Sequence, residues 1–252
     1  MRDAVGQLVP PEKHFRWRGG EITRLEGFTD AVFAFAVTLL VVSLEVPKTF
    51  TELAATMKGF VAFAICFAIL TQLWYHHYLY SRRYGLQTWY VIFLNSLLLF
   101  VVLFYVYPLK FLFTLAVGGL TGLIASQEGL RNMIQDSQVP ALFVVYSIGY
   151  TAVFLIFALL YQYAYRKRVE LQLNEYETLR TRRAVINHLG FAFVGVLVAV
   201  VALLLPPRLA AASGYLFCLN GVHGFAVGAF FGKKEKIALQ RSQAEVAGAA
   251  HS

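Results

Sequence analysis

Six long apolar runs dominate this sequence and restrict what the chain can fold into. They span roughly 27–46, 53–79, 86–108, 140–165, 185–205 and 209–231, each close to or above the roughly 20 residues that a helix needs to cross a bilayer. Hydrophobic residues make up 58% of the chain and charged residues 14%, whereas about 25% of an ordinary soluble domain is charged. Because a backbone inside a bilayer must satisfy its own hydrogen bonds, the runs predict an all-α, polytopic membrane protein with six transmembrane helices.

The basic residues indicate how these spans are oriented, because Lys and Arg prefer cytoplasmic loops. With the N-terminus inside, 17 of the 22 Lys and Arg residues fall on the cytoplasmic side. The five left outside are Lys48, Lys58, Lys110, Arg131 and Arg208. A seventh span at 109–125 would separate the basic cluster at 166–183 from the side of Arg82. That stretch therefore reads as a continuation of the third helix or as an interfacial or re-entrant piece, and both termini are predicted to be cytoplasmic.

The chain divides into a cytoplasmic N-terminal segment (1–23), a six-helix membrane domain (24–232) and a cytoplasmic tail (233–252). Its net charge of +8 follows from the topology and suits anionic lipid headgroups, so no nucleic-acid partner is expected. In the charged linker before the fifth span, Glu177 is spaced to pair with Arg180 on one helix face. We expect a multi-pass protein of the cell (plasma) membrane, with the lipid bilayer as its surroundings.

The first apolar run carries a carboxylate, Asp30, soon after its start. Ionisable side chains inside spans are expensive and point to function by default. On a helical wheel one narrow stripe is shared by four residues: Ala31, Phe35, Thr38 and Val42. Asp30 points well away from this stripe. If the stripe lines a path through the membrane, Asp30 faces neighbouring helices instead.

Three roles for Asp30 stay open on the sequence alone. The favoured one is a structural hydrogen-bond network with Arg24, or with His188, Asn220 or His223 of later spans. A proton or ion relay would need a water path, against the direction that the wheel gives. The third role is that of a wetted interfacial residue at the cytoplasmic end of the span.

Other polar residues of the spans are interpreted as structural. Trp74 and His77 lie three residues apart on one helix face and are expected to pack as a pair, and Asn95 is expected to bond between helices. His76 and His77 point about 100° apart and have no Cys, Asp or Glu at ligand spacing, so no metal site is expected. No Ser-His-Asp set or carboxylate pair suits catalysis, so neither an enzyme activity nor a cofactor is predicted.

The start of the first run carries a recognisable spacing, Arg24-x-x-x-Phe28-Thr29-Asp30. It resembles the signature that opens the first helix of the TMEM175 potassium channel family, in its bacterial, single-repeat form. Thr29 stands where the usual signature has serine, which is a conservative departure.

The resemblance continues into the next two spans. The segment LWYHHYLY at 73–80 resembles the Trp/His segment that ends the family's second helix, and Asn95 and Pro108 match an asparagine and a proline of the third. In motifs the resemblance therefore runs from Arg24 to about Pro108. Beyond that it rests on the six-helix topology.

The resemblance implies a cation channel that passes K⁺ in preference to Na⁺, formed by four copies of the chain with their first helices around a central pore. Such channels lack the TVGYG filter loop, and so does this sequence. Side chains of the first helix would then form the filter. Carried over by position, the constriction is Phe35, the threonine layer is Thr38 and the next apolar layer is Val42, with Ala31 on the same stripe.

Two of these positions leave alternatives. Phe35 replaces the family's isoleucine or leucine with a bulkier ring, and hydrophobic constrictions close pores by dewetting; a slight helix rotation would instead put Leu39 there. Thr38 either offers its hydroxyl to a partly dehydrated cation or bonds the carbonyl of Ala34, as threonine in membrane helices often does.

Other classes of membrane protein compete with this interpretation. A proton-coupled or proton-conducting transporter would use Asp30 and an intramembrane histidine, but transporters show internal repeats, and 27–108 and 140–231 do not correspond. A membrane enzyme would need the clustered catalytic residues that are missing. A structural or regulatory membrane protein stays possible until ion flux is measured.

Overall fold

The computed structural model describes residues 14–42, 47–121 and 132–249. All of its assigned elements in these ranges are helical. In chain order they are α2 (Arg24–Val42), α3 (Phe50–Lys58), α4 (Phe60–Tyr84), α5 (Trp89–Thr121), η1 (Asp136–Gln138), α7 (Val139–Arg166), α8 (Glu175–Leu204), η2 (Pro207–Cys218) and α9 (Leu219–Ala249). The all-α prediction is confirmed.

Five stretches of the described chain are long and apolar enough to cross a membrane: α4, most of α5, η1 with α7, α8, and η2 with most of α9. The remaining expected span, 27–46, corresponds to α2, which is not among these five. Three of the first seven residues of α2 are charged, namely Arg24, Glu26 and Asp30, and 43–46 lie outside the described residues. The count of six and the cytoplasmic side of the termini therefore stay predictions.

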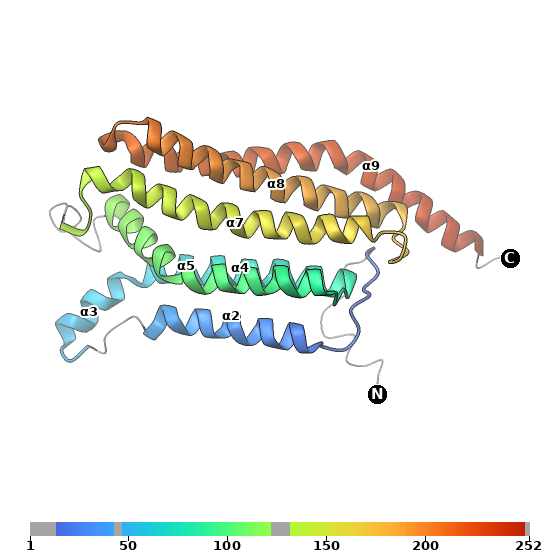
Figure 1. Cartoon of the computed structure of the whole chain (residues 1–252), viewed down its shortest axis with the longest axis horizontal. Helices are drawn as coiled ribbons and strands as arrows, with labels where there is room; N and C mark the ends of the chain where they lie inside the picture. The colour runs from blue at the N-terminus through green and yellow to red at the C-terminus, as the bar shows by residue number, and fades with distance from the viewer. Residues whose placement is uncertain (1–13, 43–46, 122–131, 250–252) are drawn as a thin grey trace.

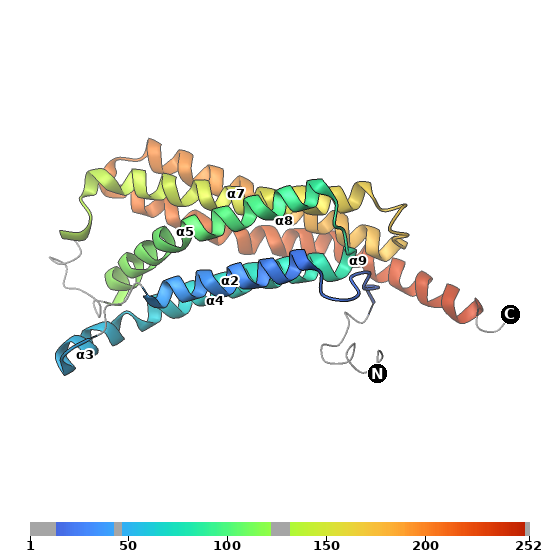
Figure 2. The same ribbon diagram turned by 60° about the horizontal axis from the view of Figure 1, so that its bottom comes forward.

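The six long helices lie side by side in two groups of three (Figures 1 and 2). The first group is α2, α4 and α5, the second is α7, α8 and α9, and the two groups meet where α5 packs on α7. The start of α2 and the end of α9 lie at the same end of the bundle, and α3 and η2 lie at the opposite end. Successive long helices thus run in alternating directions, as a polytopic chain requires.

The expected second span, 53–79, is two helices that meet at Gly59. Thr49 caps α3, because its hydroxyl oxygen accepts a hydrogen bond from the N–H of Glu52 at 3.2 Å. α4 ends at Gly85, whose φ of +58° is left-handed and favours glycine. A Cβ at Gly85 would also lie 2.9 Å from the carbonyl oxygen of Arg18, so this turn holds the N-terminal segment close.

The third and sixth spans differ from their predicted bounds. α5 continues through Pro108 to Thr121, so 109–121 is the continuation of the third helix; 122–131 lie outside the described residues. The sixth span begins as a 3₁₀ helix at Pro207, with Pro206 as its N-cap, and becomes α-helical only at Leu219. α9 then runs to Ala249, so most of the predicted cytoplasmic tail continues the same helix.

Close approach of α5 and α7 joins the two groups of helices. Gly149 of α7 lies against the ring of Tyr105, and a Cβ at Gly149 would collide with that ring. Small residues allow such approaches in membrane bundles.

Three buried tyrosines, Tyr80, Tyr84 and Tyr161, pack near the end of the bundle at which α2 begins. Their ring centroids are 5.2, 5.4 and 5.8 Å apart, and this cluster extends the core to the edge of the bundle.

Candidate functional site

α2 has two faces that differ sharply in exposure. Its buried face consists of Thr29, Phe33, Ala36 and Leu40, each at most 4% exposed, and it packs on α4 and α5. The predicted stripe lies on the opposite face, where Ala31, Phe35 and Thr38 are all exposed, Phe35 by 56%. Among the described residues of one protomer, no other element covers these three side chains.

The two ends of the stripe are Val42 on one side and the signature residues Phe28 and Arg24 on the other. Val42 is the last residue of α2, and its side chain lies outside the described residues. Phe28, one turn before Ala31, is 57% exposed, so this member of the signature does not pack in the protomer core. Arg24 is exposed at the first position of the helix.

The hydroxyl of Thr38 donates to the carbonyl of Ala34 at 2.9 Å. This is the local bond that we predicted as the alternative to an ion-facing role. A hydroxyl has one donor and two acceptor lone pairs, so the bond to Ala34 uses the proton and leaves an oxygen on the exposed face. The two readings of Thr38 are therefore compatible.

Asp30 accepts a hydrogen bond from the indole Nε1–H of Trp74 on α4 at 2.7 Å. The partners named from the sequence, Arg24 and the polar residues of later spans, are wrong. Of those residues, His188 bonds the carbonyl of Ala184 and Asn220 donates to the hydroxyl of Tyr150. The contact joins α2 to α4, as a structural network would, but through an indole donor that sequence reasoning had assigned only to packing.

Thr29 and Asn95 form the buried counterpart of that contact. The amide Nδ2 of Asn95 donates to the hydroxyl of Thr29 at 2.8 Å, and the same hydroxyl donates to the carbonyl of Leu25 at 2.8 Å. Both side chains are at most 1% exposed. His77, 4% exposed, lies beside Asn95 and Asp30. Hydrogen bonds between membrane helices contribute about 0.6 kcal/mol on average and up to about 1.7 kcal/mol.

The structure thus brings together five polar residues that the sequence singled out separately: Thr29, Asp30, Trp74, His77 and Asn95. They connect α2, α4 and α5 along the side of α2 away from the stripe. Trp74 does not pack with His77 as a pair but stacks on Tyr78, with ring centroids 5.7 Å apart. Fixing one side of α2 in this way fixes the direction in which the opposite stripe faces.

Both ends of α2 are also held. At its start, the hydroxyl of Thr23 accepts from the N–H of Glu26 at 3.1 Å, and the carboxylate of Glu26 accepts from the N–H of Thr23 at 2.8 Å, which is a capping box. Near its end, the ammonium of Lys110 donates to the carbonyl of Leu40 at 3.2 Å. A cation at the C-terminal end of a helix also interacts favourably with the helix dipole.

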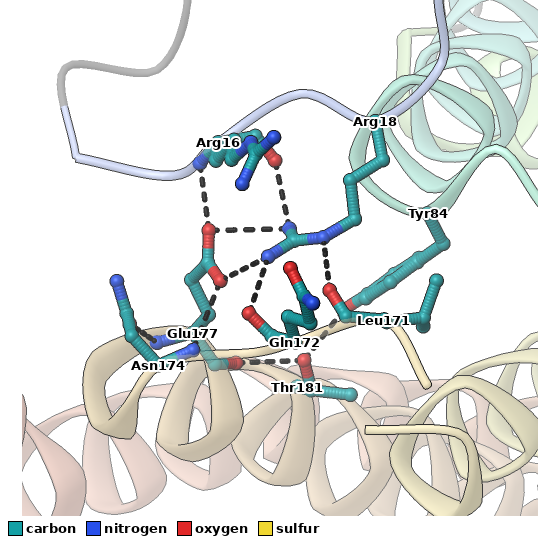
Figure 3. A network of polar contacts seen from close by, with 8 residues as sticks. All are labelled: Arg16, Arg18, Tyr84, Leu171, Gln172, Asn174, Glu177 and Thr181. Atoms are coloured by element: carbon teal, nitrogen blue, oxygen red, sulfur yellow. Dashed lines mark hydrogen bonds and ion pairs between the residues drawn. The ribbon is translucent and has the colours of Figure 1, made fainter. Parts of the chain in front are cut away.

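The segment before α2 is anchored on the other half of the bundle (Figure 3). The guanidinium of Arg18 contacts the carboxylate of Glu177 and donates to the carbonyls of Leu171 and Gln172 at 2.6 and 3.0 Å. The backbone N–H of Arg16 donates to Glu177 at 2.7 Å. The predicted pairing of Glu177 with Arg180 is wrong. A spacing rule finds partners only on the same helix, and this partner comes from 159 residues away.

The described part of the chain holds no group of three or more His, Cys, Asp or Glu residues arranged to bind a metal ion. His76 faces His188 in an edge-to-face ring contact with centroids 5.6 Å apart. The site therefore consists of one exposed helix face, with apolar and hydroxyl side chains, on a helix whose buried face and both ends are held by contacts.

Comparisons with known proteins agree with this geometry. A curated bacterial relative from Marivirga tractuosa, named "Potassium channel", is 38% identical over 246 residues, which cover 95% of this chain and 100% of the relative. The family model described as "Endosomal/lysosomal potassium channel TMEM175" matches residues 24–105, the region in which the signature, Trp74, His77 and Asn95 lie. The chain belongs to the TMEM175 family. The family resemblance stated from the sequence is confirmed.

Two further relatives match over shorter stretches. The potassium channels of Streptomyces collinus and Chamaesiphon minutus are 32% and 30% identical over 88 and 96 residues, which cover 32% and 35% of this chain and 43% and 47% of theirs. A crystal structure of a threonine-to-alanine variant of the potassium channel MtTMEM175, in complex with a nanobody fusion protein, superposes with a TM-score of 0.79. It shares 38% sequence identity and covers 89% of this chain and 100% of that chain. The family and these relatives are potassium channels, not enzymes.

Proposed function

We propose that this protein is a K⁺-selective cation channel in which four copies of the chain surround a pore lined by their α2 helices. One observation carries the proposal: Ala31, Phe35 and Thr38 occupy the face of α2 opposite its buried face and are exposed in the protomer. A helix face that the rest of the described chain leaves exposed is available to line an axis. The relatives named as potassium channels support the choice of ion.

Each layer of the stripe has a separate task in this proposal. Four Phe35 rings form a hydrophobic constriction, which conducts only when it is hydrated. Four Thr38 hydroxyls present oxygen lone pairs to a partly dehydrated ion, with their protons bonded back to Ala34. K⁺ sheds water more readily than Na⁺, so a weak ring of oxygens favours K⁺, to a modest degree. Val42 forms the next apolar layer.

The polar contacts between α2 and its neighbours α4 and α5 support a rigid pore helix. A filter made of side chains needs its helix held in rotation and height, because preorganised sites depend on the residues that support them. Asp30 with Trp74, and Thr29 with Asn95, hold the rotation. The capping box at Thr23 and the contact of Lys110 hold the two ends. This use of Asp30 in packing leaves the transporter alternative without a supporting contact.

The proposal includes the surroundings of the channel. The end of the bundle that holds both ends of the described chain also holds most of the basic residues, including Arg82, Arg83 and the cluster at 166–183. The positive-inside rule places this end in the cytoplasm and the protein in the cell membrane. The partners are then three further copies of the chain, the lipid bilayer and monovalent cations, with no cofactor.

The test is the reversal potential of the purified, reconstituted protein in a planar bilayer, with KCl on one side and NaCl on the other. We expect a current that reverses toward the K⁺ equilibrium potential and is absent from protein-free bilayers. A reversal potential at zero would refute the selectivity. If a preparation verified as a tetramer gave no current under any voltage, the assignment of the function would be wrong.

A further inference from the structure

A large cavity lies at the end of the bundle opposite the termini and takes no part in the proposed ion path. It has a volume of about 870 Å³ and lies between the second half of α5, the first half of α7 and η2. A smaller cavity of about 290 Å³ continues it toward the centre of the bundle, and the two share Tyr146, Tyr150 and Asn220 in their walls. The larger volume is roughly 30 times the ~30 Å³ that a water molecule occupies in the liquid.

The walls of the larger cavity are almost entirely apolar and aromatic. They include Leu112, Phe113, Leu142, Phe143 and Phe217. Most of this space is not suited to water, because water in a cavity needs two to four polar partners and the walls supply few polar groups. The polar groups at its inner end are partly used up: the amide Nδ2 of Asn220 donates to the hydroxyl of Tyr150 at 2.7 Å. The cavity therefore suits hydrocarbon.

One charged residue, Arg208, is part of the lining. Its side chain is 88% exposed, and its neighbours at the rim, Leu209 and Tyr215, are also exposed, so the cavity opens to the surface there. Tyr and Arg at this position are typical of the membrane–water interface. Asp136 lies 3.9 Å from Arg208 but is itself 72% exposed, and exposed ion pairs contribute little. Arg208 is thus available to a competing anion.

We propose that this cavity binds an anionic bilayer phospholipid, with one acyl chain inside it and the headgroup at Arg208. The apolar walls match the chain, Arg208, the one cation among the described lining residues, matches an anionic headgroup, and the opening lies where a span meets the bilayer surface. The phospholipid is the source because the cavity belongs to spans that sit in the bilayer, where such lipids are always present. Basic residues near a membrane surface attract anionic headgroups electrostatically; the effect is established at the cytoplasmic surface, and we extend it to the opposite surface, where Arg208 lies.

The structure offers a matched pair of variants for each half of this proposal. Gly119 lines the cavity, and a Cβ there meets nothing within 4 Å, so Gly119→Leu adds apolar bulk at the cavity wall with no clash at its Cβ. Gly221 of α9 has the same freedom but does not line the cavity, so Gly221→Leu is its control. For the headgroup, Arg208→Gln is compared with Lys48→Gln, which removes an exposed cation at the same end of the bundle.

The experiment is native mass spectrometry of the intact protein in mixed micelles containing phosphatidylglycerol, phosphatidylcholine and oleate. We expect bound phosphatidylglycerol on the unaltered protein and on both controls. Arg208→Gln should lower its occupancy about fivefold, the effect of one cation near a lipid surface, and leave phosphatidylcholine unchanged. Gly119→Leu should lower the occupancy of both phospholipids.

The proposal fails under three results. Equal phosphatidylglycerol binding by Arg208→Gln and Lys48→Gln would show that Arg208 does not bind the headgroup. Equal binding by Gly119→Leu and Gly221→Leu would place the lipid outside the cavity. Oleate bound in preference to phosphatidylglycerol would identify a free fatty acid as the ligand. Thermal unfolding of each variant, measured in the same micelles, distinguishes loss of lipid from loss of fold.

Discussion

Arg18 and Glu177 form an ion pair with Nη2 and Oε2 2.6 Å apart, and the carboxylate is 1% exposed (Figure 3). The pair joins the segment that enters α2 to the first turn of α8. Glu177 also accepts from the N–H of Asn174 at 3.1 Å, and the N–H of Glu177 donates to the Asn174 side chain at 2.8 Å, so it caps α8 as well. The hydroxyl of Tyr84 bonds Thr181 at 2.7 Å and ties the end of α4 to the second turn of α8.

Glu177→Gln is expected to lower the stability of the fold by about 3 kcal/mol, because removing one partner of a buried pair leaves an uncompensated charge. The matched control is Glu170→Gln, since Glu170 is 68% exposed and pairs only with Lys167 three residues away. Its loss should cost about 0–1 kcal/mol. Thermal unfolding in detergent measures both, and equal midpoints would show that the Arg18 contact does not support the fold.

Thr38→Ala is expected to weaken K⁺ over Na⁺ discrimination while the tetramer still forms, because it removes four hydroxyl oxygens from an exposed face and disturbs no buried contact. Thr38→Ser keeps the hydroxyl and should keep the discrimination. Reversal potentials under KCl against NaCl measure both variants. Unchanged selectivity in Thr38→Ala would move the filter elsewhere on α2.

Phe35→Leu is expected to raise the unitary conductance, because a smaller aliphatic side chain leaves a wider, more easily hydrated constriction. Phe33→Leu is the control on the opposite face: Phe33 is 4% exposed, so its truncation should lower stability and leave conductance unchanged. Single-channel recording and thermal unfolding of both variants separate the two roles. A conductance that responds to Phe33 and not to Phe35 would mean that the pore runs along the other face.

Trp74→Phe is expected to destabilise the protein by about 1 kcal/mol, because it leaves the carboxylate of Asp30 without its indole donor. The further change Asp30→Leu should cost less in Trp74→Phe than in the unaltered protein, which a double-mutant cycle on thermal unfolding measures. Asp30→Asn keeps an acceptor oxygen and should leave the K⁺/Na⁺ ratio unchanged. An altered ratio in well-assembled Asp30→Asn would put this residue on the ion path.

Gly149→Ala is expected to destabilise the protein by about 1–3 kcal/mol, the usual cost of overpacking, because the added methyl group collides with the ring of Tyr105. Gly221→Ala makes the same chemical change where nothing lies within 4 Å of the new Cβ. It should leave stability unchanged or raise it, since glycine is a poor residue for helix interiors. Thermal unfolding midpoints of the two variants measure this difference. An unchanged midpoint in Gly149→Ala would mean that α5 and α7 have room to separate.

Much of the fold and part of the site could be predicted from the sequence. Apolar runs longer than a bilayer is thick leave a helix as the main solution, so an all-α membrane protein follows from composition and length. The 3.6-residue period places Ala31, Phe35 and Thr38 on one face of α2, and the structure leaves that face exposed. The signature at Arg24–Asp30 was enough to predict the family.

Only the tertiary structure could decide which side chains meet across helices. Asp30 with Trp74, Thr29 with Asn95, and Arg18 with Glu177 are separated by 44, 66 and 159 residues. Helix periodicity says which face a residue occupies, but not which helix packs against that face or at what height. The same holds for the cavity beside Arg208, whose walls come from distant segments. Local geometry repeats along a chain and can be read from it, whereas contacts between helices depend on how all of them pack at once.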